Sequence, residues 1–167
     1  GLNMSSVVLK VNGTTVSSGI TYTDGSSGEK IGTYTASGLS DGANKVQLSV
    51  QDNDGNASSE VIVNFVISTA APTLNVTSPA NNLITNSNKV TVAGTAAAGS
   101  DSVTLSEVTV NGAKVTLISG AFTTQVTLAE GSNTITVIAK DNIGKTTTVT
   151  RTVTLDTMAP VISDVVA

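Results

Sequence analysis

The sequence predicts an all-β protein, and three observations lead to this prediction. Charged residues make up only 12% of the chain, while valine is abundant and serine and threonine fill many polar positions. β-Branched residues favour strands. Apolar and polar residues alternate with a period of two, as in 45–50, 133–139 and 149–155, which is typical of strands buried on one face. Turn residues separate these segments every 8 to 12 residues or so, as in a sandwich, and no stretch has the period of a long amphipathic helix.

The chain also repeats itself, because five short landmarks occur twice in the same order. They are V-N-G-x-x-V at 11–16 and 110–115, G-x-(Y/F)-T at 32–35 and 120–123, L-x-(D/E)-G-x-N at 39–44 and 128–133, D-N-x-G at 52–55 and 141–144, and a linker ending in A-P at 68–72 and 156–160. The first copy is longer only after V-N-G, which is the behaviour of a surface loop.

The second copy predicts a complete sandwich. Its strands are expected at 72–76, 89–96, 103–110, 115–118 and 121–128, followed by a hairpin within 133–155. This makes about seven strands, the number found in immunoglobulin-like sandwiches.

The first copy begins at the strand that leads into V-N-G, so it lacks counterparts of the first two strands. We therefore predict tandem immunoglobulin-like β-sandwiches, with an incomplete repeat at 1–69 and a complete one at 70–159. Residues 160–167 are either the first strand of a further repeat or a donor strand for another molecule. A segment cut from a longer array and a strand-complementing subunit both account for these ends, since an open sheet and a spare strand are the two halves of strand addition.

Several of these motifs resemble the bacterial Ig-like (BIg-type) repeats of secreted and cell-surface proteins. The resemblance lies in T-S-P-A-N-N at 77–82, L-A-E-G-x-N-T-I-T-V at 128–137, the V-N-G turn and the D-T-x-A-P linker. It implies an extracellular or cell-surface location and a module of the kind found in adhesins, surface-layer proteins and polysaccharide enzymes. The cysteine pair and tryptophan of antibody domains are absent.

Composition excludes several classes of function. The formal net charge is −4 and the chain has a single arginine, which argues against nucleic-acid binding. Without cysteine or histidine there is no basis for structural zinc, thiol chemistry or a histidine-dependent triad. No segment approaches the roughly 20 apolar residues of a membrane span. The carboxylates fall mainly in turns and linkers, so we expect no enzymatic activity.

Acidic turns are the candidate metal sites. Asp52 and Asp54 lie in one D-N-D-G-N turn, and Asp141 and Asn142 lie in the equivalent turn of the second copy. Oxygen ligands at this density suit calcium, but the same residues also form plain turns by bonding their own backbone. The resemblance to adhesins adds Asp156 in the second linker as a calcium ligand at a module junction. No cofactor other than calcium is expected.

Two further sets of side chains have structural interpretations. Asn44 and Asn133, from the L-x-(D/E)-G-x-N landmark, are expected to cap a turn. Of the four aromatic residues, Tyr34, Phe65 and Phe122 fall on strand positions and are expected in the core, which leaves Tyr22 in the loop-rich insertion. We therefore expect no carbohydrate-binding platform, because such platforms need exposed aromatic faces.

The function that follows is a non-enzymatic extracellular structural module, a spacer or stalk of a surface protein or adhesin. One alternative is a subunit of a head-to-tail filament assembled by strand complementation. Another is an accessory Ig-like module of a secreted polysaccharide-degrading enzyme. The expected partners are neighbouring Ig-like modules or copies of the chain itself.

Overall fold

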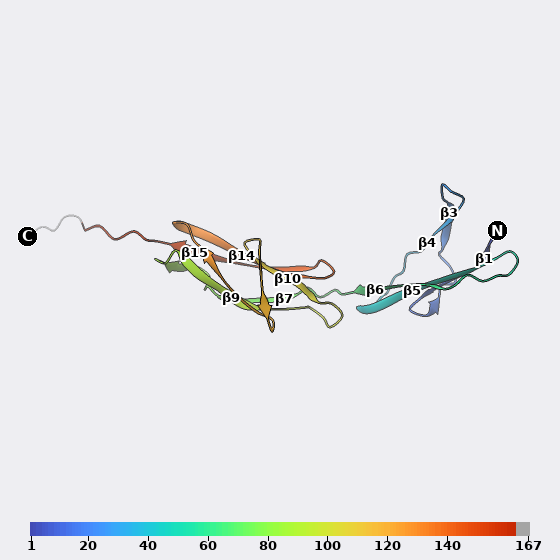
Figure 1. Cartoon of the computed structure of the whole chain (residues 1–167), viewed down its shortest axis with the longest axis horizontal. Helices are drawn as coiled ribbons and strands as arrows, with labels where there is room; N and C mark the ends of the chain where they lie inside the picture. Colours follow the sequence, from blue (N-terminus) through green and yellow to red (C-terminus); the bar gives the residue numbers. More distant parts are fainter. Residues whose placement is uncertain (163–167) are drawn as a thin grey trace, which may run out of the picture. The chain divides into compact units, whose positions relative to one another are not determined.

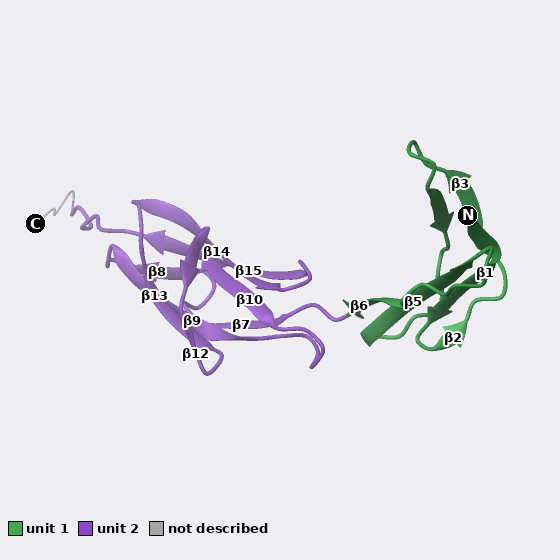
Figure 2. Cartoon of the chain, turned by 45° about the vertical axis from the view of Figure 1, so that its right-hand side comes forward, with its two compact units in different colours: residues 1–69 green, residues 70–167 purple. Residues whose placement is uncertain are grey.

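The computed structural model describes residues 1–162, and residues 163–167 lie outside the described part. The described residues form strands and no helix, so they contain no helix that could cross a membrane. The chain divides into two compact units, residues 1–69 and residues 70–167 (Figure 2). The predicted all-β class is confirmed.

Unit 2 is a closed sandwich of two sheets (Figure 1). Its strands are β7 (Thr73–Ser78), β8 (Leu83–Thr85), β9 (Lys89–Ala97), β10 (Leu105–Val110), β11 (Ala113–Val115), β12 (Leu117–Ile118), β13 (Ala121–Thr127), β14 (Gly131–Asp141) and β15 (Thr146–Leu155). One sheet has the order β11-β10-β14-β15-β8 and the other the order β12-β13-β9-β7. This is the predicted immunoglobulin-like sandwich.

The core of unit 2 comes from the alternate residues that the period-two pattern marks. Ile135, Val137 and Ala139 on β14 are fully buried, and so are Val92 on β9 and Val153 on β15. They belong to one apolar cluster that both sheets supply. Polar threonines occupy many of the intervening positions, so each strand presents an apolar face inward and a polar face to water.

The sequence prediction misses strand β8 of unit 2, and the single strand that it expects at 115–118 is divided between β11 and β12, which belong to different sheets. Strand β8 pairs in parallel with β15, from Leu83 opposite Val153 to Thr85 opposite Leu155. Three residues are too short a run to give a periodic signal. The chain reaches β8 after β7 by crossing from one sheet to the other.

The crossing between β7 and β8 is fastened by Arg151 of β15, the single arginine of the chain. Its Nη2 donates to the carbonyl oxygen of Val76 at 2.8 Å and its Nε donates to that of Pro79 at 3.2 Å. Both contacts are partly buried. Arg151 therefore joins β15 to the last part of β7 and to the segment that follows it.

We expect Arg151→Ala to lower the free energy of unfolding of unit 2 by about 1–2 kcal/mol, because hydrogen bonds from a charged group are lost and two carbonyl groups remain unpaired. Denaturant unfolding followed by far-UV circular dichroism measures this change. Lys140→Ala, at an exposed position of the adjacent strand, serves as the control and should shift stability by less than about 0.5 kcal/mol. Equal effects of the two substitutions would contradict the role given to Arg151.

Unit 1 contains only one of the two sheets of a sandwich. Its four-stranded sheet has the order β2-β1-β5-β6 and matches β11-β10-β14-β15 of unit 2, while β3 and β4 form a separate two-stranded sheet. The strands are β1 (Leu2–Val11), β2 (Thr14–Thr15), β3 (Thr21–Asp24), β4 (Lys30–Thr33), β5 (Gly42–Asp52) and β6 (Val61–Ile67). Residues 1–69 therefore contain no counterparts of β7, β8 and β9, which is the arrangement predicted for the first repeat.

The V-N-G landmark forms the same tight turn in both units. Asn12 and Gly13 have φ angles of 50° and 83°, and Asn111 and Gly112 have φ angles of 49° and 81°. Two successive residues with positive φ make the hairpin turn that matches the twist of the flanking strands, and Asn-Gly is the pair that adopts it most readily.

The second landmark, G-x-(Y/F)-T, has different structures in the two units. Gly120–Thr123 leads into β13, which pairs with β9. In unit 1, Gly32 and Thr33 belong to β4, whose partner is β3. The longer segment after V-N-G in the first copy therefore folds back on itself as a hairpin, because no β9 counterpart is present for it to join.

The large apolar side chains of unit 1 remain partly exposed. All the buried apolar side chains of the described residues belong to unit 2. In unit 1 the large apolar residues Leu48, Val61 and Val63 remain between 42% and 59% exposed. At the other end of the chain, residues 160–162 are not in a strand, and the rest of the predicted strand at 161–166 lies outside the described residues.

Candidate functional site

The turn after β5 is built around Asp52, the first of the predicted calcium ligands. Its Oδ1 accepts hydrogen bonds from the backbone N–H of Asp54 at 2.9 Å and of Asn56 at 2.8 Å. Its Oδ2 accepts from the side-chain Nδ2 of Asn56 at 2.8 Å. Both carboxylate oxygens are therefore engaged within the turn itself.

The turn after β14 repeats this geometry around Asp141. Its Oδ1 accepts from the backbone N–H of Ile143 at 3.1 Å and of Lys145 at 2.7 Å. The neighbouring Asn142 accepts from the backbone N–H of Thr104 at 3.0 Å. Asp141 Oδ2 is buried and has no hydrogen-bond partner. In both turns an aspartate bonds its own backbone, which is the structural alternative that the sequence left open beside calcium.

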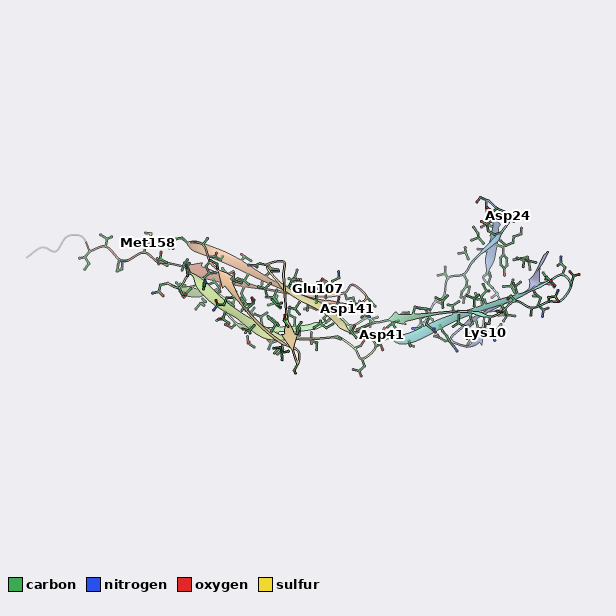
Figure 3. All side chains as sticks on the ribbon, in the orientation of Figure 1. Lys10, Asp24, Asp41, Glu107, Asp141 and Met158 are labelled. Carbon is green, nitrogen blue, oxygen red and sulfur yellow. The ribbon has the colours of Figure 1, made fainter. Side chains whose placement is uncertain are left out.

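Asp156 lies at the opposite end of unit 2 from Asp141. The antiparallel pairing of β14 with β15 requires this, since Asp141 ends β14 and Asp156 follows the end of β15. Figure 3 shows Asp141 and Met158 at the two ends of the unit. The Thr147 hydroxyl donates to the Pro72 carbonyl, so the Asp141 turn lies at the end of unit 2 where the chain enters the sandwich.

Asp156 is itself held locally. Its backbone N–H donates to the carbonyl of Thr85 at 2.9 Å, and its Oδ1 accepts from the backbone N–H of Met158 at 3.1 Å. Among residues 1–162 there is no group of three or more His, Cys, Asp or Glu residues placed to hold a metal ion. Calcium binding by Asp52, Asp54, Asp141, Asn142 and Asp156 stays a prediction.

The Asn56 hydrogen bonds act on the acidity of Asp52. The bond from the Asn56 side chain, followed by that from its backbone, holds the pKa of the Asp52 carboxyl below its ordinary value, because hydrogen bonds to the ionised form favour it. Since the folded-state pKa is the lower one, this contribution to stability is present above the unfolded-state pKa and is lost as the pH falls through the folded-state pKa.

We expect Asn56→Ala to raise the pKa of Asp52 towards its ordinary value, because the largest contribution to the shift is removed. An NMR titration of the Asp52 side chain measures this directly. Asn53→Ala in the same turn is the matched control and should leave the pKa of Asp52 in place. An Asn56→Ala variant with an unchanged Asp52 pKa would show that Asn56 is not its cause.

A pair of acid–threonine contacts was missed by the sequence interpretation. The Asp41 carboxylate accepts from both the backbone N–H and the hydroxyl of Thr69, each at 2.7 Å. In unit 2 the Glu130 carboxylate accepts from the backbone N–H of Thr157 at 3.1 Å and from its hydroxyl at 2.8 Å. We call these contacts the exit clamps, because each holds the threonine just past the last strand of its unit.

The repeat itself contains the signal for the exit clamps. Asp41 and Glu130 occupy the same position of the L-x-(D/E)-G-x-N landmark, and Thr69 and Thr157 occupy the same position of the linker. An acid and a hydroxyl retained at matching positions of both copies point to a contact. Sequence reasoning assigned the acids to turns and did not consider the linker threonines as their partners.

The landmark asparagines cap turns, as predicted. Asn44 Nδ2 donates to the carbonyls of Ser40 at 3.1 Å and Gly42 at 3.0 Å. Asn133 Nδ2 donates to those of Ala129 at 2.8 Å and Gly131 at 2.9 Å. In each unit the asparagine side chain therefore holds the turn at the start of the longest strand.

The aromatic residues are divided between a core and a groove. Phe122 is buried in unit 2, as predicted. Tyr34 is 38% exposed, which corrects the prediction that it lies in the core. With Tyr22 it lines a groove of about 270 Å³ whose other walls come from β1 and β5. The groove is mainly apolar, because the β3–β4 hairpin lies beside the uncovered sheet of unit 1; the groove residues are Leu2, Met4, Val7, Leu9, Ile20, Tyr22, Lys30, Gly32, Tyr34, Leu48 and Val50.

Comparison with known proteins gives one family match. The family described as "Glucodextranase, domain B" matches residues 72–157, which is just over half of the chain and includes every strand of unit 2 from β7 to β15.

Two further proteins are similar over most of the chain. Bacillopeptidase F of Bacillus subtilis (strain 168) is 29% identical over 128 residues, which are 77% of this chain and 9% of that protein. The chain therefore spans about a tenth of the length of this curated relative. The fibronectin(III)-like modules of Clostridium thermocellum CbhA are 20% identical with a TM-score of 0.51, over 92% of this chain and 79% of that one.

Together these matches support an immunoglobulin-like or fibronectin(III)-like fold, which is the general part of the predicted resemblance. They do not single out BIg-type repeats.

Proposed function

The chain belongs to the glucodextranase domain B family, and from this we propose that it is a non-catalytic spacer module of a larger secreted enzyme. Within this proposal the chain holds other domains apart, and the chemistry takes place outside residues 1–167. The family name refers to one domain of an enzyme, which favours the accessory-module alternative over the stalk of an adhesin.

One observation carries the proposal: 77% of this chain corresponds to only 9% of a peptidase. A tandem of Ig-like units that makes up so small a share of an enzyme is a connecting or positioning part of it. That the family and the relative carry names of enzymes with different substrates fits a shared mechanical role better than a shared substrate, because a fold by itself does not specify chemistry.

The exit clamps support a spacer role. In each unit an acid fixes the backbone and side chain of the threonine that follows the last strand, and a proline comes three residues later, Pro72 or Pro160. Proline fixes its own φ angle and restricts the residue before it. The direction in which the chain leaves each unit is therefore restricted, and restricted exits are what a spacer requires.

The distribution of carboxylates supports the absence of catalysis. Acid–base catalysis by a pair of carboxylates needs the two groups held close together in a site that shifts their pKa values apart. Asp52 and Asp141 are instead tied into separate backbone turns, and Asp41 and Glu130 bind linker threonines.

An antibody raised against the chain tests the proposal in the organism that produces it. Immunoblots of the culture medium, the cell surface and the cytosol should reveal a polypeptide much larger than 16.7 kDa, mainly in the medium. Once captured by the antibody, this polypeptide should hydrolyse a polysaccharide or a protein substrate, whereas the isolated 167-residue chain should hydrolyse neither.

Two results would contradict the proposal. A cytosolic band at the mass of the chain alone would exclude a spacer of a secreted enzyme. A large surface-bound polypeptide without hydrolase activity would instead support the stalk of a surface protein.

A further inference from the structure

In unit 2 the first and last strands lie against each other. We call residues 73–85, which include β7 and β8, the entry segment, because the chain enters the sandwich there. The last strand, β15, ends at Leu155. β7 packs on β15, and β8 pairs with β15 in parallel, from Leu83 opposite Val153 to Thr85 opposite Leu155. The two parts through which unit 2 continues into the rest of the chain are therefore in direct contact.

Tension along the chain would act on this contact in one particular direction. The chain enters and leaves at opposite ends of unit 2, so tension would draw the entry segment back toward Pro72 and draw β15 onward toward Asp156. Because β8 and β15 are parallel, these opposite pulls slide one strand along the other, and the hydrogen bonds between them carry the load together. Two antiparallel neighbours pulled apart at the same end instead lose their bonds pair by pair.

Further hydrogen bonds reinforce the contact beyond the strand pairing. Arg151 of β15 donates to the carbonyl oxygens of Val76 and Pro79 in the entry segment, and bonds from a charged donor are stronger than neutral ones. Three more bonds join the same two parts of unit 2; they run from the Thr152 N–H to Asn81 Oδ1 at 2.9 Å, from the Asn82 N–H to the Thr152 carbonyl at 2.8 Å, and from the Asp156 N–H to the Thr85 carbonyl at 2.9 Å. Sliding is therefore resisted along most of the entry segment.

We propose that unit 2 is a load-bearing module, in which the contact between the entry segment and β15 resists tension along the chain. The proposal rests on the spacer role proposed above, because a spacer transmits the forces that act between the parts it joins. It goes beyond that role, since a spacer that only sets a distance needs no particular strand to carry load. The single arginine of the chain then has a mechanical role, because it ties the last strand to the entry segment at two points.

Single-molecule force spectroscopy of the full chain tests the proposal. The chain contains no cysteine, so pairs of introduced cysteines attach the pulling handles at chosen points. Ala71→Cys with Met158→Cys, both at exposed positions just outside the strands of the sandwich, loads unit 2 between its entry and its exit. Force applied to this first cysteine pair should slide the entry segment along β15.

Lys89→Cys with Thr127→Cys gives the comparison direction. Lys89 and Thr127 are exposed partners at the same end of β9 and β13, so handles there separate two antiparallel strands pair by pair. We expect unit 2 to unfold at roughly twice the force when it is pulled through the first cysteine pair, because several hydrogen bonds are then loaded together instead of in sequence.

Two variants, each combined with the first cysteine pair, remove bonds from the contact. At a constant force Arg151→Ala should unfold about tenfold faster, and Asn81→Ala about fivefold faster, than the chain with the cysteine pair alone. Asn142→Ala is the matched control, because Asn142 Oδ1 likewise accepts from a backbone N–H, that of Thr104 at 3.0 Å, but lies outside the contact. It should change the unfolding rate by less than about twofold.

Equal unfolding forces in the two pulling directions would overturn the proposal. An unfolding rate under load that neither Arg151→Ala nor Asn81→Ala changes would also overturn it, as would a rate that Asn142→Ala raises as much as Asn81→Ala does. The location and the hydrolase activity that test the spacer role do not enter this measurement, so failure of that role and failure of the load-bearing role give different results.

Discussion

Ile135→Ala should lower the free energy of unfolding of unit 2 by about 2–5 kcal/mol, the range for removing most of a buried isoleucine. Ile135 is fully buried in the middle of β14 and belongs to the apolar cluster formed by both sheets. The closed sandwich cannot collapse into the space that the side chain leaves, because close-packed neighbours from two sheets hold its walls in place.

The two units can be followed separately in one experiment. Both tyrosines of the chain, Tyr22 and Tyr34, lie in unit 1, and the chain has no tryptophan. Tyrosine fluorescence therefore reports on unit 1 alone, whereas far-UV circular dichroism reports on both units. We expect Ile135→Ala to move the dichroism transition that belongs to unit 2 and to leave the fluorescence transition in place.

Leu48→Ala is the matched control in the open unit. Leu48 occupies the position equivalent to Val137, which lies two residues after Ile135 on the same face of the strand, but Leu48 remains 42% exposed. Its truncation should cost about 1 kcal/mol or less, because much of its surface is already in water. At concentrations where the chain is monomeric, a loss as large as that of Ile135→Ala would show that the face of unit 1 is covered in solution.

The sequence predicted most of the closed unit because its longer strands carry two independent signals. The alternation in 133–139 marks the buried face of β14, and the turn residues at 141–144 mark its end. Strand β8 was missed because its three residues are paired only through tertiary contacts, and the Arg151 contacts that hold the crossing join positions more than seventy residues apart.

The error in unit 1 has a different physical cause. The sequences of 32–35 and 120–123 match, but whether a segment forms a strand of a given sheet depends on the strand that it can pair with. Residues 121–123 belong to β13, which pairs with β9. Gly32 and Thr33 belong to β4, which pairs with the nearby strand β3. Tyr34 then lines a groove instead of entering a core.

The candidate site shows the same limit. The residue types of the acidic turns were predicted, and so was the competition between metal binding and backbone capping. The choice of partner was not, since Asp52 bonds Asn56 while Asp41 reaches Thr69, twenty-eight residues away. Only the folded topology brings the second pair together.

Gly94→Ala should destabilise unit 2 by roughly 2 kcal/mol, although alanine is ordinarily the better residue in a strand. Gly94 lies in β9 between Val76 of β7 and Phe122 of β13. A Cβ atom there would overlap the carbonyl oxygen of Asn75 and approach the Phe122 Cζ atom to 2.8 Å. The ring can turn aside, but the backbone oxygen cannot move without disturbing the pairing of β7 with β9.

Two opposite contributions decide whether Gly94→Ala raises or lowers the stability of unit 2. Replacing glycine with alanine in a strand gains about 0.5–1 kcal/mol by reducing the entropy of the unfolded chain, and overpacking a core costs about 1–3 kcal/mol, occasionally more. We expect the cost of the steric overlap to exceed the entropic gain, because the overlap involves a backbone oxygen atom. Thr95→Ala at the next, exposed position of β9 is the control and should change stability by less than about 0.5 kcal/mol. If Gly94→Ala proved as stable as the wild type in denaturant unfolding, β7 would have to lie farther from β9, and the close approach of Asn75 to Gly94 within this sheet would be wrong.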